Sequence, residues 1–505
     1  MELLNQAFAY HEEGRARALL NLLNNAGVRA RKGVAPNLVE QEDRLRADIS
    51  ALQNAFSDER VSEFRNTSLQ EAMDEQAAAL GRLHAKMAAL NSKYESIASP
   101  QMSNLADVQA LLGSDSVLLE YDLGPEFSGV AVVTNHEIRV YRLPSQDVIT
   151  KSLNEFLPTL WVPLFGQDEI EKHVRLAKNL YQELLGSAGD LLRSKHHIVI
   201  VPDADLYYLP FETLIAPDKK PERPGGSLAS QPYLGKAYSF SYAPSSSVLV
   251  AVERNALKNR VSRLANQSPL LAFGDPSLGP SPPASQLALS TRGAYKEMGV
   301  TFIPLPYSRE EIRRVAAVFG IKPGSSSINL GDQATKKRLE QLDLTQYRFL
   351  HFATHAVVGD EVKWINQPAL ILSPERNGES DDGLLKMSDI FNLRLNADLV
   401  VLSACETARG KMSRGEGIVG LTSAFLFAGS DSVVASLWNV NDESTSRFMQ
   451  FFYQGLHSGL SKAEALRVAR NELMNTRITS PETQEEEDLS SPYFWAPFIL
   501  VGGWK

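Results

Sequence analysis

Two residues of this 505-residue chain have the types and placement that nucleophilic catalysis requires. Cys405, the single cysteine, lies three residues beyond the apolar run Leu399–Leu402, and His355 lies three residues beyond the run Phe349–Phe352. Both runs are strand-sized, so we expect both residues at carboxyl ends of strands, in loops outside the core. In an open α/β sheet, that edge is where ligands bind. A thiol and an imidazole meet there if the two strands are neighbours.

The chemistry that this pair predicts is acyl transfer through a thiolate. A thiol with a pKa of about 8.5 is mostly protonated at pH 7, and an imidazole within reach can take its proton. The thiolate of Cys405 would attack a carbonyl carbon, and backbone N–H groups would hold the oxyanion. His355 would then protonate the leaving amine, so the predicted reaction is peptide-bond hydrolysis.

Other motifs in the sequence do not indicate a metal or a cofactor. His351 lies four residues before His355, but in a strand this spacing separates two residues by about 13 Å, too far to share an ion. We therefore expect His351 to be a hydrogen-bonded core residue. A G-x-G-x-x-G match at Gly415–Gly420 does not follow its strand directly, as a dinucleotide-binding loop would. We predict no cofactor and no metal site.

Strands that alternate with helices are expected to position the pair. Residues 116–143 show β-branched alternation interrupted by turn signals, which predicts a strand meander, and 146–194 has helical periodicity. Runs typical of buried parallel strands follow at Ile198–Val201, Leu270–Phe273, Phe349–Phe352, Leu370–Leu372, Leu399–Leu402 and Val433–Ala435. Helical stretches occur at Arg309–Phe319, Ala334–Leu342, Met387–Leu393, Gly417–Phe427 and Ser444–Leu456. This order predicts an α/β fold with a mostly parallel sheet and helices on both faces.

The first 100 residues differ from the rest of the chain in having apolar residues at helical spacing and almost no proline. Their opening has the pattern of a helix pair from a tetratricopeptide array. We expect three domains: a helical, TPR-like regulatory segment at 1–100, a strand meander with helices at 101–195, and a catalytic α/β domain at 196–505. Segments rich in Pro, Gly, Ser and acids are expected to be surface loops without regular structure, at 217–231, 276–291 and 477–492.

Composition excludes several classes of partner and site. Lys and Arg number 51 against 60 Asp and Glu, and the net charge of −9 argues against nucleic acid as a direct ligand. One cysteine forbids an internal disulfide and suits a reducing compartment. The opening residues lack the order of a secretory signal, and no apolar run has the length of a membrane span. We expect a cytoplasmic protein without a membrane partner.

A series of motifs follows in order along the chain: VPDADLYYLPFETL, LAFGDP, the Gln333-Ala334-Thr335 helix start, LHFATHA, VVLSACETARG, GEGIVGLTSAFLFAGSDSVVASLWNVND and YFWAPFILVGGW. Together they resemble the CHAT domain, a caspase-like domain usually found behind tetratricopeptide repeats. The resemblance covers roughly residues 100–505. The interval of 50 residues from His355 to Cys405 also matches the caspase spacing.

The resemblance implies a caspase-hemoglobinase fold with a His355–Cys405 catalytic dyad. It also implies that the backbone N–H groups of Cys405 and Ala356 hold the oxyanion. The family often has glycine at the position of Ala356, and the methyl group restricts the backbone there. Glu406-Thr407 follows the cysteine in place of the glycine-containing caspase signature, which argues against caspase-type specificity for aspartate.

The loop SLWNVND is similar to a segment of separases, which belong to the same clan, and is expected to form the primary specificity pocket. Trp438 would be its apolar wall, and Asn439 and Asp442 would be acceptors. An acidic acceptor favours Arg or Lys before the scissile bond. The alternative for Asp442 is a cap of the helix that follows.

Three functions stay open at this stage. The first is a cysteine endopeptidase that cuts a specific protein substrate, under control of a regulatory protein bound by the N-terminal helices. The second is a catalytically silent CHAT scaffold that binds other proteins. The third is acyl transfer or ligation through the same thioester. Bacterial relatives in the resembling family act in defence or developmental signalling, and we expect one of those settings here.

Overall fold

The computed structural model describes residues 103–505 apart from 223–226, 264–266, 279–304, 306, 358–366, 375–382, 407–415, 439–441 and 480–485, and scattered residues of the first 102. The chain forms two compact units. The smaller is Glu13–Met102, whose described residues are helical and include the buried Leu38 and Leu83. The larger contains Met1–Glu12 and Ser103–Lys505.

One sheet of 13 strands forms the centre of the larger unit. The main strand order is β10-β9-β8-β11-β12-β15-β5-β4-β1-β2-β3, and β6 pairs with β7 and β8. The strands are β1 Ser116–Asp122, β2 Ser128–Val133, β3 Ile138–Leu143, β4 His197–Val201, β5 Ser239–Tyr242, β6 Ser268–Gly274, β7 Ile328–Leu330, β8 Tyr347–Val357, β9 Ala369–Ile371, β10 Leu384–Lys386, β11 Leu399–Glu406, β12 Ser432–Ser436 and β15 Phe498–Gly502.

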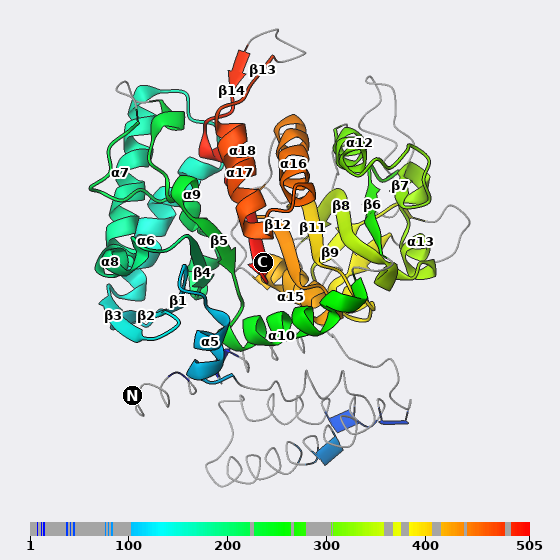
Figure 1. Ribbon diagram of the computed structural model, residues 1–505, viewed down its shortest axis with the longest axis horizontal. Coiled ribbons are helices and arrows are strands. Elements are labelled where there is room, and N and C mark those ends of the chain that lie inside the picture. Colours follow the sequence, from blue (N-terminus) through cyan, green and yellow to red (C-terminus); the bar gives the residue numbers. More distant parts are fainter. Residues whose placement is uncertain are drawn as a thin grey trace, which may run out of the picture. The chain divides into compact units, whose positions relative to one another are not determined.

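The sheet has two halves whose strands run in opposite directions. In the β8 half, the strands β6, β8, β11 and β12 are parallel. In the β4 half, the strands β15, β5, β4 and β1 are parallel to one another. The halves meet at β12 and β15, which are antiparallel. The carboxyl ends of the two halves therefore lie at opposite edges of the sheet, with the β8 half on the right of Figure 1 and the β4 half on the left.

Helices cover both faces of the sheet, as neighbouring side chains of β8 show. His351 bonds to Glu311 of α12 and Tyr453 of α16, whereas the ring of Phe352 lies 5.7 Å from that of Phe425 in α15. The helices are α5 Leu105–Leu111, α6 Gln146–Phe156, α7 Gln167–Leu184, α8 Gly189–Leu192, α9 Leu234–Ala237, α10 Ser246–Arg263, α12 Ser308–Val318, α13 Lys336–Gln341, α14 Met387–Phe391, α15 Glu416–Ala428, α16 Asp442–His457, α17 Lys462–Met474 and α18 Pro492–Trp495. The predicted α/β fold with a mostly parallel sheet is confirmed.

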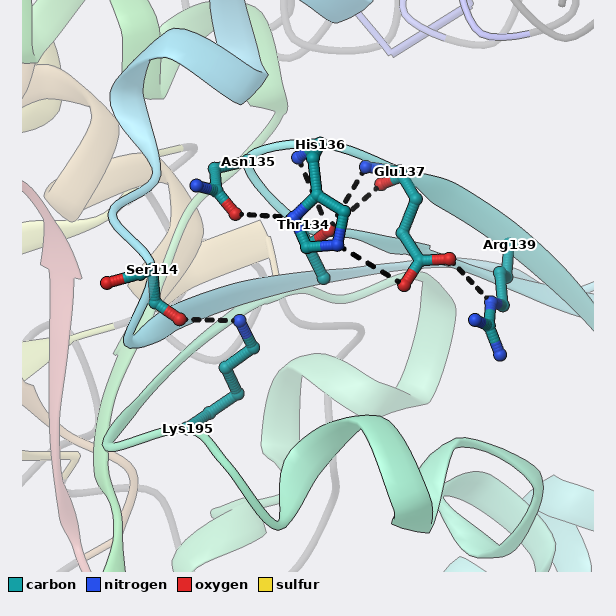
Figure 2. Close-up of polar contacts among 7 residues, drawn as sticks. All are labelled: Ser114, Thr134, Asn135, His136, Glu137, Arg139 and Lys195. Atoms are coloured by element: carbon teal, nitrogen blue, oxygen red, sulfur yellow. Dashed lines mark hydrogen bonds and ion pairs between the residues drawn. The ribbon is translucent and has the colours of Figure 1, made fainter.

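The predicted meander at 116–143 is confirmed as the antiparallel strands β1, β2 and β3. Its second turn falls at Asn135-His136, where the sequence places a turn signal. Figure 2 shows this turn, closed by the N–H of Thr134, which donates to the carbonyl of Glu137 at 2.9 Å. The side chain of Glu137 then accepts from Nε of Arg139 at 2.8 Å. Nearby, Lys195 fixes the start of β4 by donating to the carbonyl of Ser114 at 2.7 Å.

Two expectations about local structure were wrong. The segment 477–492 contains a hairpin of β13 Arg477–Thr479 and β14 Glu486–Asp488, anchored by the buried Ile478. Cross-strand pairing gives partners to backbone groups in a segment whose composition indicates a loop. The strand at Leu370–Leu372 exists as β9, but it is antiparallel to β8.

Segment 217–231 holds one short 3-10 helix, Leu228–Ser230, among its described residues, and most of 276–291 lies outside the described residues.

None of the described helices combines the length and apolar character that crossing a membrane requires.

Candidate active site

The two residues predicted to react lie opposite each other on neighbouring strands. β8 and β11 are parallel, and their register pairs His355 with Cys405 and Ala356 with Glu406. Neighbouring strands of a sheet are about 4.8 Å apart, so the backbones of the two residues are adjacent. Both positions are within the last three residues of their strands. The structure thus brings the pair together at the carboxyl edge of the β8 half.

The expectation that both residues lie in loops beyond their strands was wrong. β8 continues five residues past the apolar run that predicts it and ends at Val357. The reason is a change of neighbour: β6 pairs with β8 up to Ala353, and β9 pairs with it from His355 to Val357. Because β9 and β11 flank this end of β8, its backbone stays in a ladder where a sequence pattern shows no strand.

Burial of the histidine follows from this extension of β8. His355 is only 3% exposed, and Ala356 is 8% exposed. Residues four apart in a strand share a face, so His355 faces the same side as His351, the side covered by α12 and α16. The structure describes the position of Cys405 in β11, and residues 407–415 lie outside the described residues.

Beneath the pair, His351 has two hydrogen-bond partners in the core, as predicted. Its Nδ1 lies 3.1 Å from the hydroxyl of Tyr453, and its Nε2 lies 2.9 Å from Oε1 of Glu311. His351 and Tyr453 are fully buried and Glu311 is 1% exposed. Burial raises the pKa of Tyr453 well above its usual value, with a further contribution from the charge of Glu311. The network ties β8 to α12 and α16 rather than contributing a second reactive imidazole.

A charged pair that sequence reasoning did not select lies at the same edge of the sheet. Asp275 follows β6 directly, has the left-handed φ of 47° that is uncommon outside glycine, and accepts from Nε of Arg309 at 2.6 Å. The preceding Gly274 allows close packing, because a Cβ there would lie 2.7 Å from the carbonyl oxygen of Ala353. The signal that could have identified this pair is the Gly-Asp-Pro sequence after a buried strand.

The predicted specificity loop follows β12, at the same edge as His355 and Cys405 because β12 is parallel to β11. Trp438 is 6% exposed, and its indole N–H donates to the carbonyl of Tyr493 in α18 at 3.1 Å. Asn439 lies outside the described residues, and Asp442 is the first residue of α16. The structure therefore fixes Trp438 against α18 and places Asp442 at the first position of α16, whereas a helix cap precedes that position.

Among the described residues, no three His, Cys, Asp or Glu side chains come together in a way that could hold a metal ion.

Comparison with known proteins gives one family match. The family model of the CHAT domain matches residues 174–503. Tetratricopeptide repeat protein 28 of Mus musculus and of Homo sapiens are each 28% identical to this chain over 355 residues. The match covers 63% of this chain but only 12% of either relative.

Solved structures are also similar to this chain. A separase–securin complex of Saccharomyces cerevisiae gives a TM-score of 0.45 at 11% identity, covering 92% of this chain and 40% of that chain. The Arg specific cysteine proteinase gingipain R gives a TM-score of 0.31 at 9% identity, with 67% of each chain covered.

Proposed function

Since this chain belongs to the CHAT domain family, we propose that it is a cysteine endopeptidase in which His355 and Cys405 form the catalytic dyad. The observation that supports this most directly is the parallel register of β8 and β11, which pairs the only cysteine of the chain with a histidine. The pair lies at the carboxyl edge of the strands, where α/β proteins bind ligands.

The reaction proceeds through a thioester. Cys405 transfers its proton to His355, and the thiolate sulfur attacks the carbonyl carbon of the scissile peptide bond. The backbone N–H groups of Cys405 and Ala356 are the proposed donors to the oxyanion. His355 returns the proton to the leaving amine as the C–N bond breaks. Water then attacks the thioester, giving up a proton to the imidazole, and the thiol is released.

The experiment that tests this proposal is covalent labelling of Cys405 by a peptidyl electrophile. We expect rapid labelling of the wild type and a loss of at least about 10³-fold in rate in His355→Ala, since the imidazole is needed to form the thiolate. His136→Ala is the matched control, because His136 lies on the exposed β2–β3 turn in Figure 2, far along the sheet from β8. Equal labelling rates in His355→Ala and the control would refute the dyad.

We further propose that Trp438, Asn439 and Asp442 contribute to the substrate pocket and favour Arg or Lys before the scissile bond. The support is the position of this loop after β12, at the edge that carries His355. The substrate is proposed to be a protein, and the N-terminal helices are proposed to bind a regulatory protein. The cytoplasm remains the proposed location.

A catalytically silent scaffold is the second candidate, and the burial of His355 is the observation that favours it. A residue that is 3% exposed and lies inside a strand ladder can be retained for packing alone. The labelling experiment separates the two functions. A folded protein whose Cys405 reacts no faster than a free thiol would be a scaffold.

A further inference from the structure

The carboxyl edge of the β4 half is closed by a carboxylate from the start of the chain. Glu12 is fully buried, although it lies more than 200 residues before α10, whose first turn it contacts. Phe8, one helical turn earlier, is also buried at 5% exposure. Phe8 and Glu12 are both helical and both buried within the larger unit, which includes Met1–Glu12.

Glu12 satisfies backbone donors that every helix leaves open at its start. Its Oε1 accepts from the N–H of Ser246 at 3.1 Å, and its Oε2 accepts from the N–H of Ser247 at 2.6 Å. The next N–H, that of Val248, donates to the hydroxyl of Ser245, the residue before the helix, at 3.2 Å. Two amides in the first turn of this 18-residue helix therefore have their partner in a carboxylate from the N-terminal segment.

A second buried carboxylate faces the first. Glu120, in β1, is 2% exposed and accepts from the hydroxyl of Ser246 at 2.7 Å. Glu120 is the titratable group that acts on Glu12, whose other neighbours are the serine groups of α10. Burial, followed by the negative charge of Glu120, raises the pKa of Glu12 to about 7. A helix amino end favours a negative charge, but two buried carboxylates repel when both are ionised.

We propose that the amino end of α10 is a binding site for a single carboxylate, that of Glu12. This contact acts as a latch: it keeps the N-terminal helix docked when the Glu12–Glu120 pair retains a proton. The latch lies directly before the N-terminal unit, which begins at Glu13. It is also at the edge of the sheet opposite to His355. Docking of the segment is thus linked to pH and open to competition by acidic side chains of other proteins.

The test of the latch is hydrogen exchange of the segment Ser245–Leu249 in the full chain, measured by mass spectrometry. Glu12→Ala should raise the exchange rate of this segment at least about tenfold, because two amides lose their acceptor. Glu155→Gln removes an exposed acid from α6 and should leave the rate unchanged. Protection in β11 should be the same in all variants. Glu12→Ala exchange equal to that of the control overturns the proposal.

A second measurement tests the shared proton. A carboxyl group with a raised pKa in the docked state favours docking at low pH, and the advantage is lost as pH rises from 4.5 to about 7. The wild type should lose protection of Ser245–Leu249 relative to Glu12→Gln between pH 5 and pH 8, by about 70-fold for a pKa that rises from 4.5 to about 7. The same pH dependence in both proteins would contradict the role of the proton. Neither readout involves Cys405, so the outcome is independent of the proposed peptidase.

Discussion

The two carboxyl edges of the sheet are both formed by the ends of parallel strands, but different residues lie at each edge. At the edge of the β8 half, two parallel strands end with His355 opposite Cys405. At the edge of the β4 half, two carboxylates meet the amino end of α10, and the chain supplies one of them from its own N-terminal segment. The antiparallel pair β12 and β15 separates the two edges by reversing the strand direction.

If both proposals hold, one sheet keeps catalysis and regulation at separate edges. Each half has the edge at which α/β proteins bind ligands. One edge carries the proposed nucleophile and base, whereas the other is occupied by Glu12, which takes the place of an anionic ligand. The predictions below test this separation.

The largest effect is expected from removing either reactive residue. Cys405→Ala and His355→Ala should each lower peptide cleavage by at least about 10³-fold. Because His355 is buried within the ladder, His355→Ala should also reduce the free energy of unfolding by about 1–3 kcal/mol. Cleavage of a peptide library and urea unfolding measure the two effects. Full cleavage by either variant would show that the catalytic residues do not lie at the edge of the β8 half.

The next effect concerns the buried network beneath the pair. Glu311→Gln should lower the free energy of unfolding by about 1–3 kcal/mol, because the buried His351 loses a carboxylate hydrogen-bond partner. Urea unfolding at pH 7 gives the value. Glu310→Gln, which removes an exposed partner of Arg314, should change it by less than about 0.5 kcal/mol. Equal effects of the two variants would show that the network does not stabilise the β8 half.

Acid sensitivity should be concentrated in the β4 half. Burial lowers the pKa of His173 in α7 and of His197 in β4 to about 3 each. A lowered histidine pKa contributes stability that is complete above about pH 6.5 and is lost as pH falls toward 3. Each histidine should therefore cost about 1.4 kcal/mol of unfolding free energy per pH unit below pH 5.5.

The variant His173→Phe tests this assignment, since it removes the titrating group and keeps an aromatic ring stacked on Phe156. Its unfolding free energy should fall less steeply with acid than that of the wild type, by the slope of one histidine. His136→Gln, at an exposed position, should follow the wild type. An unchanged slope in His173→Phe would show that His173 is not the acid-sensitive group.

The smallest effect is expected at the specificity loop. If Asp442 accepts a basic side chain of the substrate, Asp442→Ala should reduce the preference for Arg or Lys before the scissile bond by about tenfold, as loss of one charged contact predicts. A substrate library profiled on both proteins gives the preference. A wild type that prefers Asp or an aliphatic residue, or an unchanged preference in the variant, would leave Asp442 as a residue of the helix start only.

Local patterns in the sequence were sufficient for most elements of the β8 half. The strands at Leu399–Leu402 and Val433–Ala435 and the helices after them are periodic enough to be recognised without knowledge of their neighbours. The same patterns place the cysteine and the histidine near the ends of strands. The identity of β5, Ser239–Tyr242, was missed because alternating serines do not resemble a buried strand.

The sequence by itself therefore determined the reactive residue types, the strands that carry them and the mostly parallel sheet, because these depend on side-chain chemistry and local periodicity. Tertiary structure alone decided that β8 extends through His355, that β15 reverses the sheet direction and that Glu12 meets Glu120. Each of these results depends on pairing between residues far apart in the chain. The backbone groups and buried charges involved find their partners only once the sheet is assembled.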